Sequence, residues 1–100
     1  MGGRLIREDV VTGSVAMLDP ILIRRRIEAT ISDAEAQVVD TTGTGDHFAA
    51  RVVADAFAGR SPVEQHRMVY AGLGDLLATG ELHALALETY TPDEWARVSG

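Results

Sequence analysis

The chain has 100 residues, of which 46% are hydrophobic and 24% are charged, a composition typical of one small globular domain. Its formal net charge of −6 argues against a general affinity for nucleic acid, whose phosphates demand a basic protein surface. The absence of cysteine excludes disulfides, thiolate metal sites and cysteine nucleophiles, so a bound metal would need histidine, carboxylate or a partner's thiols.

Residues 1–18 carry no periodic apolar face, and we interpret them as a flexible leader before a domain over residues 19–98. Met17 is a candidate natural start, so deletion of residues 1–16 should leave the stability nearly unchanged. No apolar run approaches the length of about 20 residues that spans a bilayer. Charges stand where a signal peptide would need its apolar centre, which argues against export. We expect a cytoplasmic protein with no membrane insertion.

The first predicted helix covers residues 19–31. Asp19 is a suitable N-cap, and Pro20 at the first helical position already has the φ angle that a helix requires. Isoleucines recur every fourth residue and form one apolar stripe, which predicts an amphipathic helix: Ile23, Ile27 and Ile31.

A β-hairpin is predicted next. Residues 36–40 and 47–55 have β-like patterns, and the glycine-rich residues 41–46 between them are typical of a turn. In the second strand, alternate apolar residues share one face: Phe48, Ala50, Val52 and Ala54. We expect the two strands to pair in an antiparallel manner.

A second helix is predicted over residues 61–78. Ser61 and Glu64 form a capping box around Pro62, which signals the helix start. Apolar residues gather on one side of this helix: Val69, Leu73, Leu76 and Leu77. Gly72 and Gly74 weaken its centre, by roughly 1 kcal/mol each relative to alanine, so we expect the helix to bend or split there.

The closing segment predicts a strand and a short helix. His83 opens the strand and shares the parity of Leu85 and Leu87, as in a half-buried strand. A second capping box, Thr91-Pro92-Asp93-Glu94, predicts a helix over residues 91–97. Trp95, the single tryptophan, is the expected anchor of that helix.

These elements predict an α+β domain, in which a three-stranded sheet has its helices packed on one face. The opposite face of the sheet should stay wet, because Arg51 and Glu88 alternate outward.

Four motifs in order resemble the BolA family. The closing residues 90–97 and the short loop before His47-Phe48 are most similar to its IbaG-like bacterial branch. The resemblance covers about residues 19–98. The residues that carry it are Asp46-His47-Phe48, Phe57-Ala58-Gly59-Arg60-Ser61, Gln65-His66-Arg67-Met68-Val69-Tyr70, and Leu82-His83-Ala84-Leu85 through Thr91-Pro92-Asp93-Glu94-Trp95-Ala96-Arg97.

The resemblance implies a class II KH-like fold and a partner. BolA proteins pair with monothiol glutaredoxins that have a CGFS active site, and the heterodimer holds a bridging [2Fe-2S] cluster. In the family, the histidine that opens the last strand is a cluster ligand, which corresponds to His83 here. Glutathione and the glutaredoxin would then supply the thiolates that this chain lacks.

The second ligand of the family, His or Cys, comes from the loop between the first two strands, where this chain departs from the pattern. Thr44 stands where some relatives carry the cysteine, and other relatives carry a histidine in a longer insertion. His47 matches the family's histidine before phenylalanine and is the candidate second ligand here, with Asp46 as a weaker rival. If the hairpin packs as expected, the Asp46-His47 loop should place two imidazoles at one edge of the sheet.

No catalytic constellation stands out, and we expect no enzymatic activity. Ser61, His66 and Asp75 could suggest a triad, but Ser61 belongs to the capping box and no nucleophile elbow surrounds it. The sequence around Gly43 and Gly45 lacks the lysine and following helix of a phosphate-binding loop.

Two functions remain open from the sequence. The first is the adaptor that shares a cluster with a glutaredoxin through His83, in iron–sulfur trafficking or in iron or stress regulation. Without its partner this adaptor is expected to be a monomer or a weak homodimer. The second is a DNA-binding transcriptional regulator that uses the KH-like or helix-turn-helix surface and a local basic patch with Arg60 and Arg67. The acidic net charge and the lack of a basic Gly-x-x-Gly clamp count against the second.

Overall fold

The computed structural model describes residues 18–100, so the predictions for residues 1–16 and for Met17 lie outside the described part. The elements, in chain order, are α2 (Pro20–Thr30), β2 (Glu35–Asp40), β3 (His47–Val53), the 3₁₀ turn η2 (Asp55–Phe57), α3 (Pro62–Ala71), α4 (Gly74–Thr79), β4 (Ala84–Tyr90) and α5 (Pro92–Ser99). Within residues 18–100, no helix is long and apolar enough to cross a membrane.

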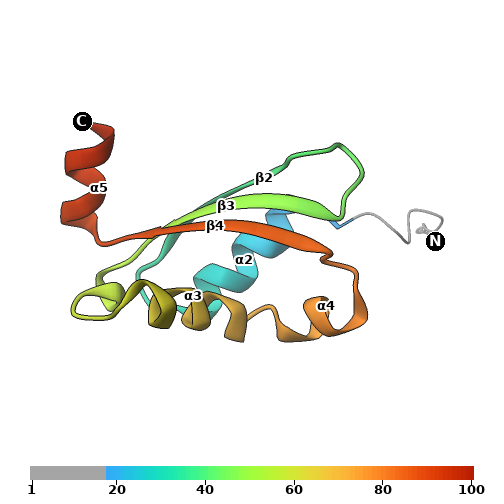
Figure 1. Ribbon diagram of the computed structural model, residues 1–100, viewed down its shortest axis with the longest axis horizontal. Coiled ribbons are helices and arrows are strands. Elements are labelled where there is room, and N and C mark those ends of the chain that lie inside the picture. The colour runs from blue at the N-terminus through green and yellow to red at the C-terminus, as the bar shows by residue number, and fades with distance from the viewer. Residues whose placement is uncertain (1–17) are drawn as a thin grey trace, which may run out of the picture.

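The sheet has three strands in the order β2-β3-β4. β2 and β3 pair in an antiparallel manner, as predicted for the hairpin. β3 and β4 pair in parallel, which the crossover through η2, α3 and α4 makes possible (Figure 1). β3 ends two residues earlier than predicted because Asp55 already begins η2, and β4 begins one residue after His83.

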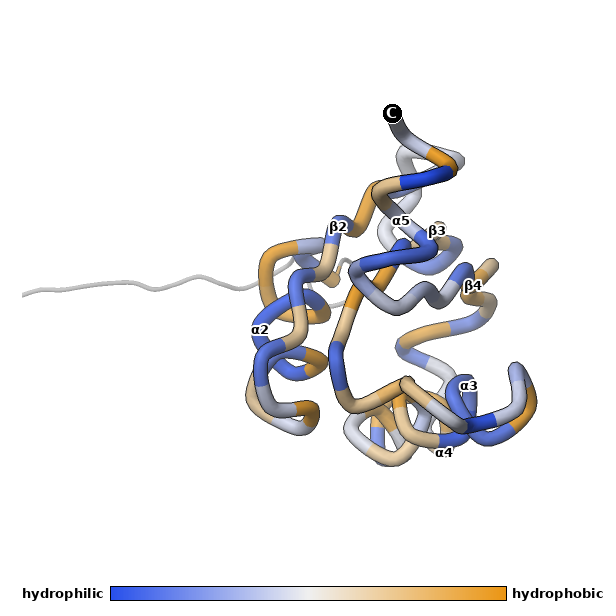
Figure 2. Tube along the Cα trace, turned by 90° about the vertical axis from the view of Figure 1, so that its left-hand side faces the viewer, coloured by the Kyte–Doolittle hydropathy of each residue, from blue (hydrophilic) through white to orange (hydrophobic). Residues whose placement is uncertain are grey.

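The helices α2, α3 and α4 cover one face of the sheet (Figures 1 and 2). The alternate apolar residues predicted to share one face of the second strand point into this layer. All of them are at most 4% exposed: Phe48, Ala50, Val52 and Ala54. The isoleucine stripe of α2 and the apolar side of α3 close the core from below: Ile23, Ile27, Ile31, Val69 and Leu73. The predicted core faces and the α+β class are therefore confirmed.

The three predicted helix starts are confirmed by their caps. The Asp19 carboxylate accepts a hydrogen bond from the Ile21 N–H at 2.9 Å. Ser61 and Thr91 each form a complete capping box with the glutamate three residues later, and proline follows each cap. These local contacts hold because each satisfies backbone N–H groups that a helix start leaves unpaired.

The expected break in the second helix separates α3 from α4. Gly72 caps α3, and α4 begins at Gly74. Close packing adds a reason for glycine here, because a Cβ atom on Gly72 would lie 2.3 Å from Oγ1 of Thr30 at the end of α2. The missing side chain of Gly72 therefore lets the end of α2 approach the end of α3.

Helix α5 differs from the other three, because it rises from the sheet on the side opposite α3 and α4 (Figure 1). Trp95 lies half-buried, with the Arg51 guanidinium 4.2 Å from its ring centroid and the Tyr90 ring at 5.3 Å. These contacts confirm Trp95 as the anchor of α5 and show that it docks on the outward face of β3.

Gln65 ties α3 to its neighbours, a role that the sequence pattern did not reveal. Its side chain is 7% exposed, and its amide donates to the carbonyls of Phe57 at 3.2 Å and Arg60 at 3.0 Å. Its own oxygen accepts from the Thr89 hydroxyl at 2.6 Å. One buried amide thus joins η2, α3 and β4.

Candidate metal centre

The two candidate ligands meet where β3 and β4 begin. In the parallel ladder, His47 pairs with Ala84. The Asp46 carbonyl accepts hydrogen bonds from the N–H groups of His83 at 2.8 Å and Ala84 at 3.2 Å. The backbone before β3 is therefore bonded to the backbone before β4.

This pairing places the two imidazoles side by side. The ring centroids of His47 and His83 lie 4.9 Å apart, with the ring planes tilted by 48°. The expectation of two imidazoles at one edge of the sheet is confirmed, while their role as ligands stays a prediction. His83 itself is exposed and precedes β4, whereas Leu85 and Leu87 within the strand are half-buried.

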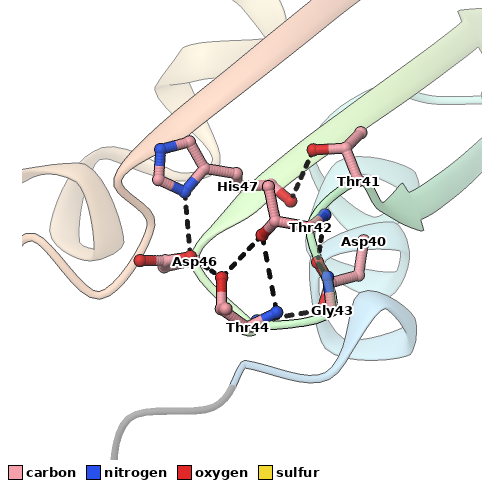
Figure 3. A network of polar contacts seen from close by, with 8 residues as sticks. Asp40, Thr41, Thr42, Gly43, Thr44, Asp46 and His47 are labelled. Carbon is pink, nitrogen blue, oxygen red and sulfur yellow. Dashed lines mark hydrogen bonds and ion pairs between the residues drawn. The ribbon is translucent and has the colours of Figure 1, made fainter.

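The turn before His47 is held by Asp40 (Figure 3). Its carboxylate accepts from the backbone N–H groups of Thr42 at 3.1 Å, Gly43 at 2.8 Å and Gly45 at 2.9 Å. Gly43 and Gly45 have φ angles of 78° and 76°, which side chains disfavour. Partial burial raises the pKa of Asp40, but the three backbone bonds outweigh it and lower the pKa overall.

Asp46 contacts His47 directly (Figure 3). Its Oδ1 lies 2.9 Å from Nδ1 of His47, and the Thr44 hydroxyl donates to the same oxygen. The bonds from Thr44 and His47 hold the pKa of Asp46 below its ordinary value, so the carboxylate is ionised near neutral pH. Sequence reasoning treated Asp46 only as a rival ligand and missed this contact, which the adjacency of Asp and His in the chain could have suggested.

The histidine pair can supply two nitrogen ligands. Among residues 18–100, no group of three His, Asp or Glu side chains is arranged to hold a metal ion. His47 is 39% exposed and its Nδ1 faces Asp46, which leaves Nε2 for another atom. Two neighbouring imidazoles therefore fit an iron centre as two of its ligands, because imidazole suits iron.

The arginines predicted for nucleic acid lie elsewhere. Arg60 is exposed just before α3, and Arg67 is exposed in the middle of that helix. The Arg60 Nε–H donates to the Ala56 carbonyl at 3.2 Å. Arg60 and His66 line a groove of about 310 Å³ together with the carboxylates of Glu88 and Glu94. This groove adjoins the Tyr90 end of β4, so the structure does not bring Arg60 to the histidine pair.

Comparison with known proteins identifies relatives of this chain. Residues 25–94 match the family model described as "BolA-like protein". The acid stress protein IbaG of Escherichia coli K12 is 39% identical over 61 residues, which cover 61% of this chain and 73% of IbaG. The DNA-binding transcriptional regulator BolA of Vibrio cholerae is 46% identical over 57 residues, which cover 57% of this chain and 53% of that protein.

Solved structures agree with this result. A bolA protein homologue from Coxiella burnetii superimposes with a TM-score of 0.71 at 35% identity, covering 81% of this chain and all of that one. The BolA domain of SufE1 from Arabidopsis thaliana gives a TM-score of 0.67 at 36% identity, covering 84% and 99%. The fold, the family model and these relatives agree, and the chain belongs to the BolA-like family.

Proposed function

We propose that this protein is a non-enzymatic adaptor that pairs with a monothiol glutaredoxin and shares a [2Fe-2S] cluster with it. His83 and His47 would be the cluster ligands from this chain. The observation that carries the proposal is the 4.9 Å separation of the two rings, reached by residues from different parts of the sequence. Family membership supports the same reading, because the resemblance assigns a cluster ligand to the position of His83.

The division of ligands follows from the composition. With no cysteine, this chain offers no thiolate ligand, so thiolates must come from the glutaredoxin and its glutathione. Histidine ligation raises the reduction potential of a [2Fe-2S] cluster relative to ligation by cysteine alone. Backbone hydrogen bonds fix the main chain at both histidines, which holds the two residues next to each other where β3 and β4 begin.

The test compares two histidine variants in the presence of a CGFS glutaredoxin that carries its cluster. His83→Ala should abolish or strongly change the visible absorption and circular dichroism of the mixture, because it removes one ligand. His66→Ala should leave both spectra unchanged. His66 lines the groove beside Arg60, away from His83, so it is a matched control for the loss of an imidazole.

Unchanged spectra for the His83→Ala mixture would remove the ligand role of His83. The protein would then bind glutaredoxin through protein contacts alone, or act as a regulator. Gel filtration of the same mixture separates these two results, because it reports the heterodimer whether or not the cluster is ligated.

DNA-binding regulation is the second candidate function. It is favoured by the exposure of Arg60 and Arg67 and by relatives that are named DNA-binding transcriptional regulators. The nearby carboxylates of Glu88 and Glu94 and the net charge of −6 oppose it. If these arginines contact phosphates, DNA affinity must fall steeply as salt rises, and Arg67→Ala must reduce the slope by about 1.

A further inference from the structure

Asp46 contacts both histidines of the candidate centre, through two different groups. Its carboxylate oxygen Oδ1 lies 2.9 Å from Nδ1 of His47. Its main-chain carbonyl accepts the N–H of His83 at 2.8 Å and the N–H of Ala84 at 3.2 Å. One residue therefore touches the side chain of one histidine and the backbone of the other.

We propose that Asp46 is the positioning residue of this centre: it fixes the His47 tautomer so that Nε2 presents its lone pair, and it bonds the backbone that carries His83. The inference rests on the proposed function, which makes His47 and His83 ligands. Asp46 itself is not a ligand in this arrangement. Its Oδ1 is engaged by His47 and Thr44 instead.

The tautomer follows from hydrogen-bond chemistry. An ionised carboxylate only accepts hydrogen bonds, so Nδ1 of His47 must be the donor in its contact with Asp46. In a neutral imidazole the other nitrogen, Nε2, then carries the free lone pair. Histidine ligands of metals commonly donate their second ring N–H to a carboxylate in this way, which fixes the ring and makes it more basic.

The turn before Asp46 also holds the carboxylate in place. The Thr44 hydroxyl donates to the same Oδ1, and Thr44 is in turn hydrogen-bonded to the Thr42 hydroxyl at 2.6 Å (Figure 3). The acceptor that orients His47 is therefore itself oriented by the preceding turn.

The carboxylate and the carbonyl can be tested separately, because a side-chain substitution keeps the main-chain carbonyl. Asp46→Ala removes the acceptor for Nδ1, whereas Asp46→Asn keeps an amide oxygen there and loses only the charge. Asp93→Ala is the control for the loss of one carboxylate. Asp93 is exposed on α5, and β4 separates that helix from His83.

The first measurement needs no iron. Two-bond ¹H–¹⁵N spectra of the purified full chain, near pH 8.5, about two units above an ordinary imidazole pKa, report the tautomer of each neutral histidine. We expect His47 to be predominantly Nδ1–H in the wild type and to lose that excess in Asp46→Ala. Asp46→Asn should fall between them, while His83 should not change. An unchanged His47 tautomer in Asp46→Ala would overturn the inference.

The second measurement uses the heterodimer with the cluster-loaded CGFS glutaredoxin. Loss of such an orienting partner typically weakens metal binding by 10- to 100-fold, so Asp46→Ala should lose its cluster to a chelator about tenfold faster or more. Asp93→Ala should match the wild type. Equal loss rates for Asp46→Ala and wild type would also overturn the inference, whereas a wild type that takes up no cluster overturns the proposed function and leaves the tautomer result standing.

Discussion

On the face of the sheet that α2 and α3 cover, Phe48 and Val52 of β3 are 2% and 0% exposed, while their neighbours Ala49 and Arg51 on the opposite face remain partly open. The covered face is ordered by apolar packing. On the open face, the Arg51 guanidinium stacks on Trp95. Where β3 and β4 begin, backbone hydrogen bonds hold the residues next to His47 and His83 in place. The buried apolar area that stabilises this small domain therefore lies mainly on one side of the sheet, and the side chains of the other side remain accessible.

Phe48→Ala creates a cavity on the covered face and should cause the largest loss of unfolding free energy. It removes a fully buried ring, and such substitutions cost about 3–5 kcal/mol of unfolding free energy. Val39→Ala, at a side chain 58% exposed on β2, should change the free energy by no more than about 0.5 kcal/mol. Urea unfolding followed by circular dichroism measures both.

If Phe48→Ala fails to fold, Phe48→Leu provides a smaller version of the same change. Similar losses for the Phe48 and Val39 substitutions would contradict the contrast between the two faces.

Gln65→Leu tests a buried polar side chain inside the covered layer. The substitution keeps the volume but leaves the Arg60 carbonyl and the Thr89 hydroxyl without their partner, which should cost about 1–3 kcal/mol. Gln37→Leu is the matched control, because Gln37 is exposed on β2 and bonds Arg51 on the open face. In thermal unfolding, Gln65→Leu should lower the melting temperature much more than Gln37→Leu. The reverse order would mean that the buried amide does not tie the elements together.

The ion pair between α2 and α4 should have the smallest effect, because it lies at the surface of the covered layer. Arg26 holds the Asp75 carboxylate with two bonds, at 2.7 and 2.9 Å. The Arg26 hydrogen bond lowers the pKa of Asp75 from 3.8 to about 2. A folded pKa below the unfolded one adds stability above pH 3.8, and that stability is lost as the pH falls through about 2.

Asp75→Asn should therefore lower the urea midpoint slightly at pH 6, and the difference from wild type should vanish near pH 2. High salt should shrink the difference at pH 6, because the pair is exposed. A difference that persists at pH 2 would show that the asparagine acts through packing and not through the lost charge.

Local signals in the sequence predicted most of the fold. The caps at Asp19, Ser61 and Thr91 determine where helices begin through contacts within four residues, so they can be read without knowing the rest. The alternation in β3 likewise indicated its buried face. The break around Gly72 was also predictable, although its contact with Thr30 was not.

Contacts between distant segments were not predictable from these patterns. The parallel pairing of β3 with β4, the bonds of Gln65 and the pair of Arg26 with Asp75 all depend on how the elements pack. The candidate centre contains one residue that could be predicted and one contact that could not. His83 was singled out by the family resemblance, whereas the role of the Asp46 carbonyl depends on the strand register, which one sequence does not reveal.

The parallel register also has a kinetic consequence. His47 and His83 come together only after the chain between them has folded back through α3 and α4 to complete the crossover. Closing a long loop costs entropy before the contacts it allows are gained, and such non-local pairing slows folding. The two imidazoles should therefore come together late during folding. A partner that must contact both at once would bind the fully folded protein and not nascent or partly folded chains.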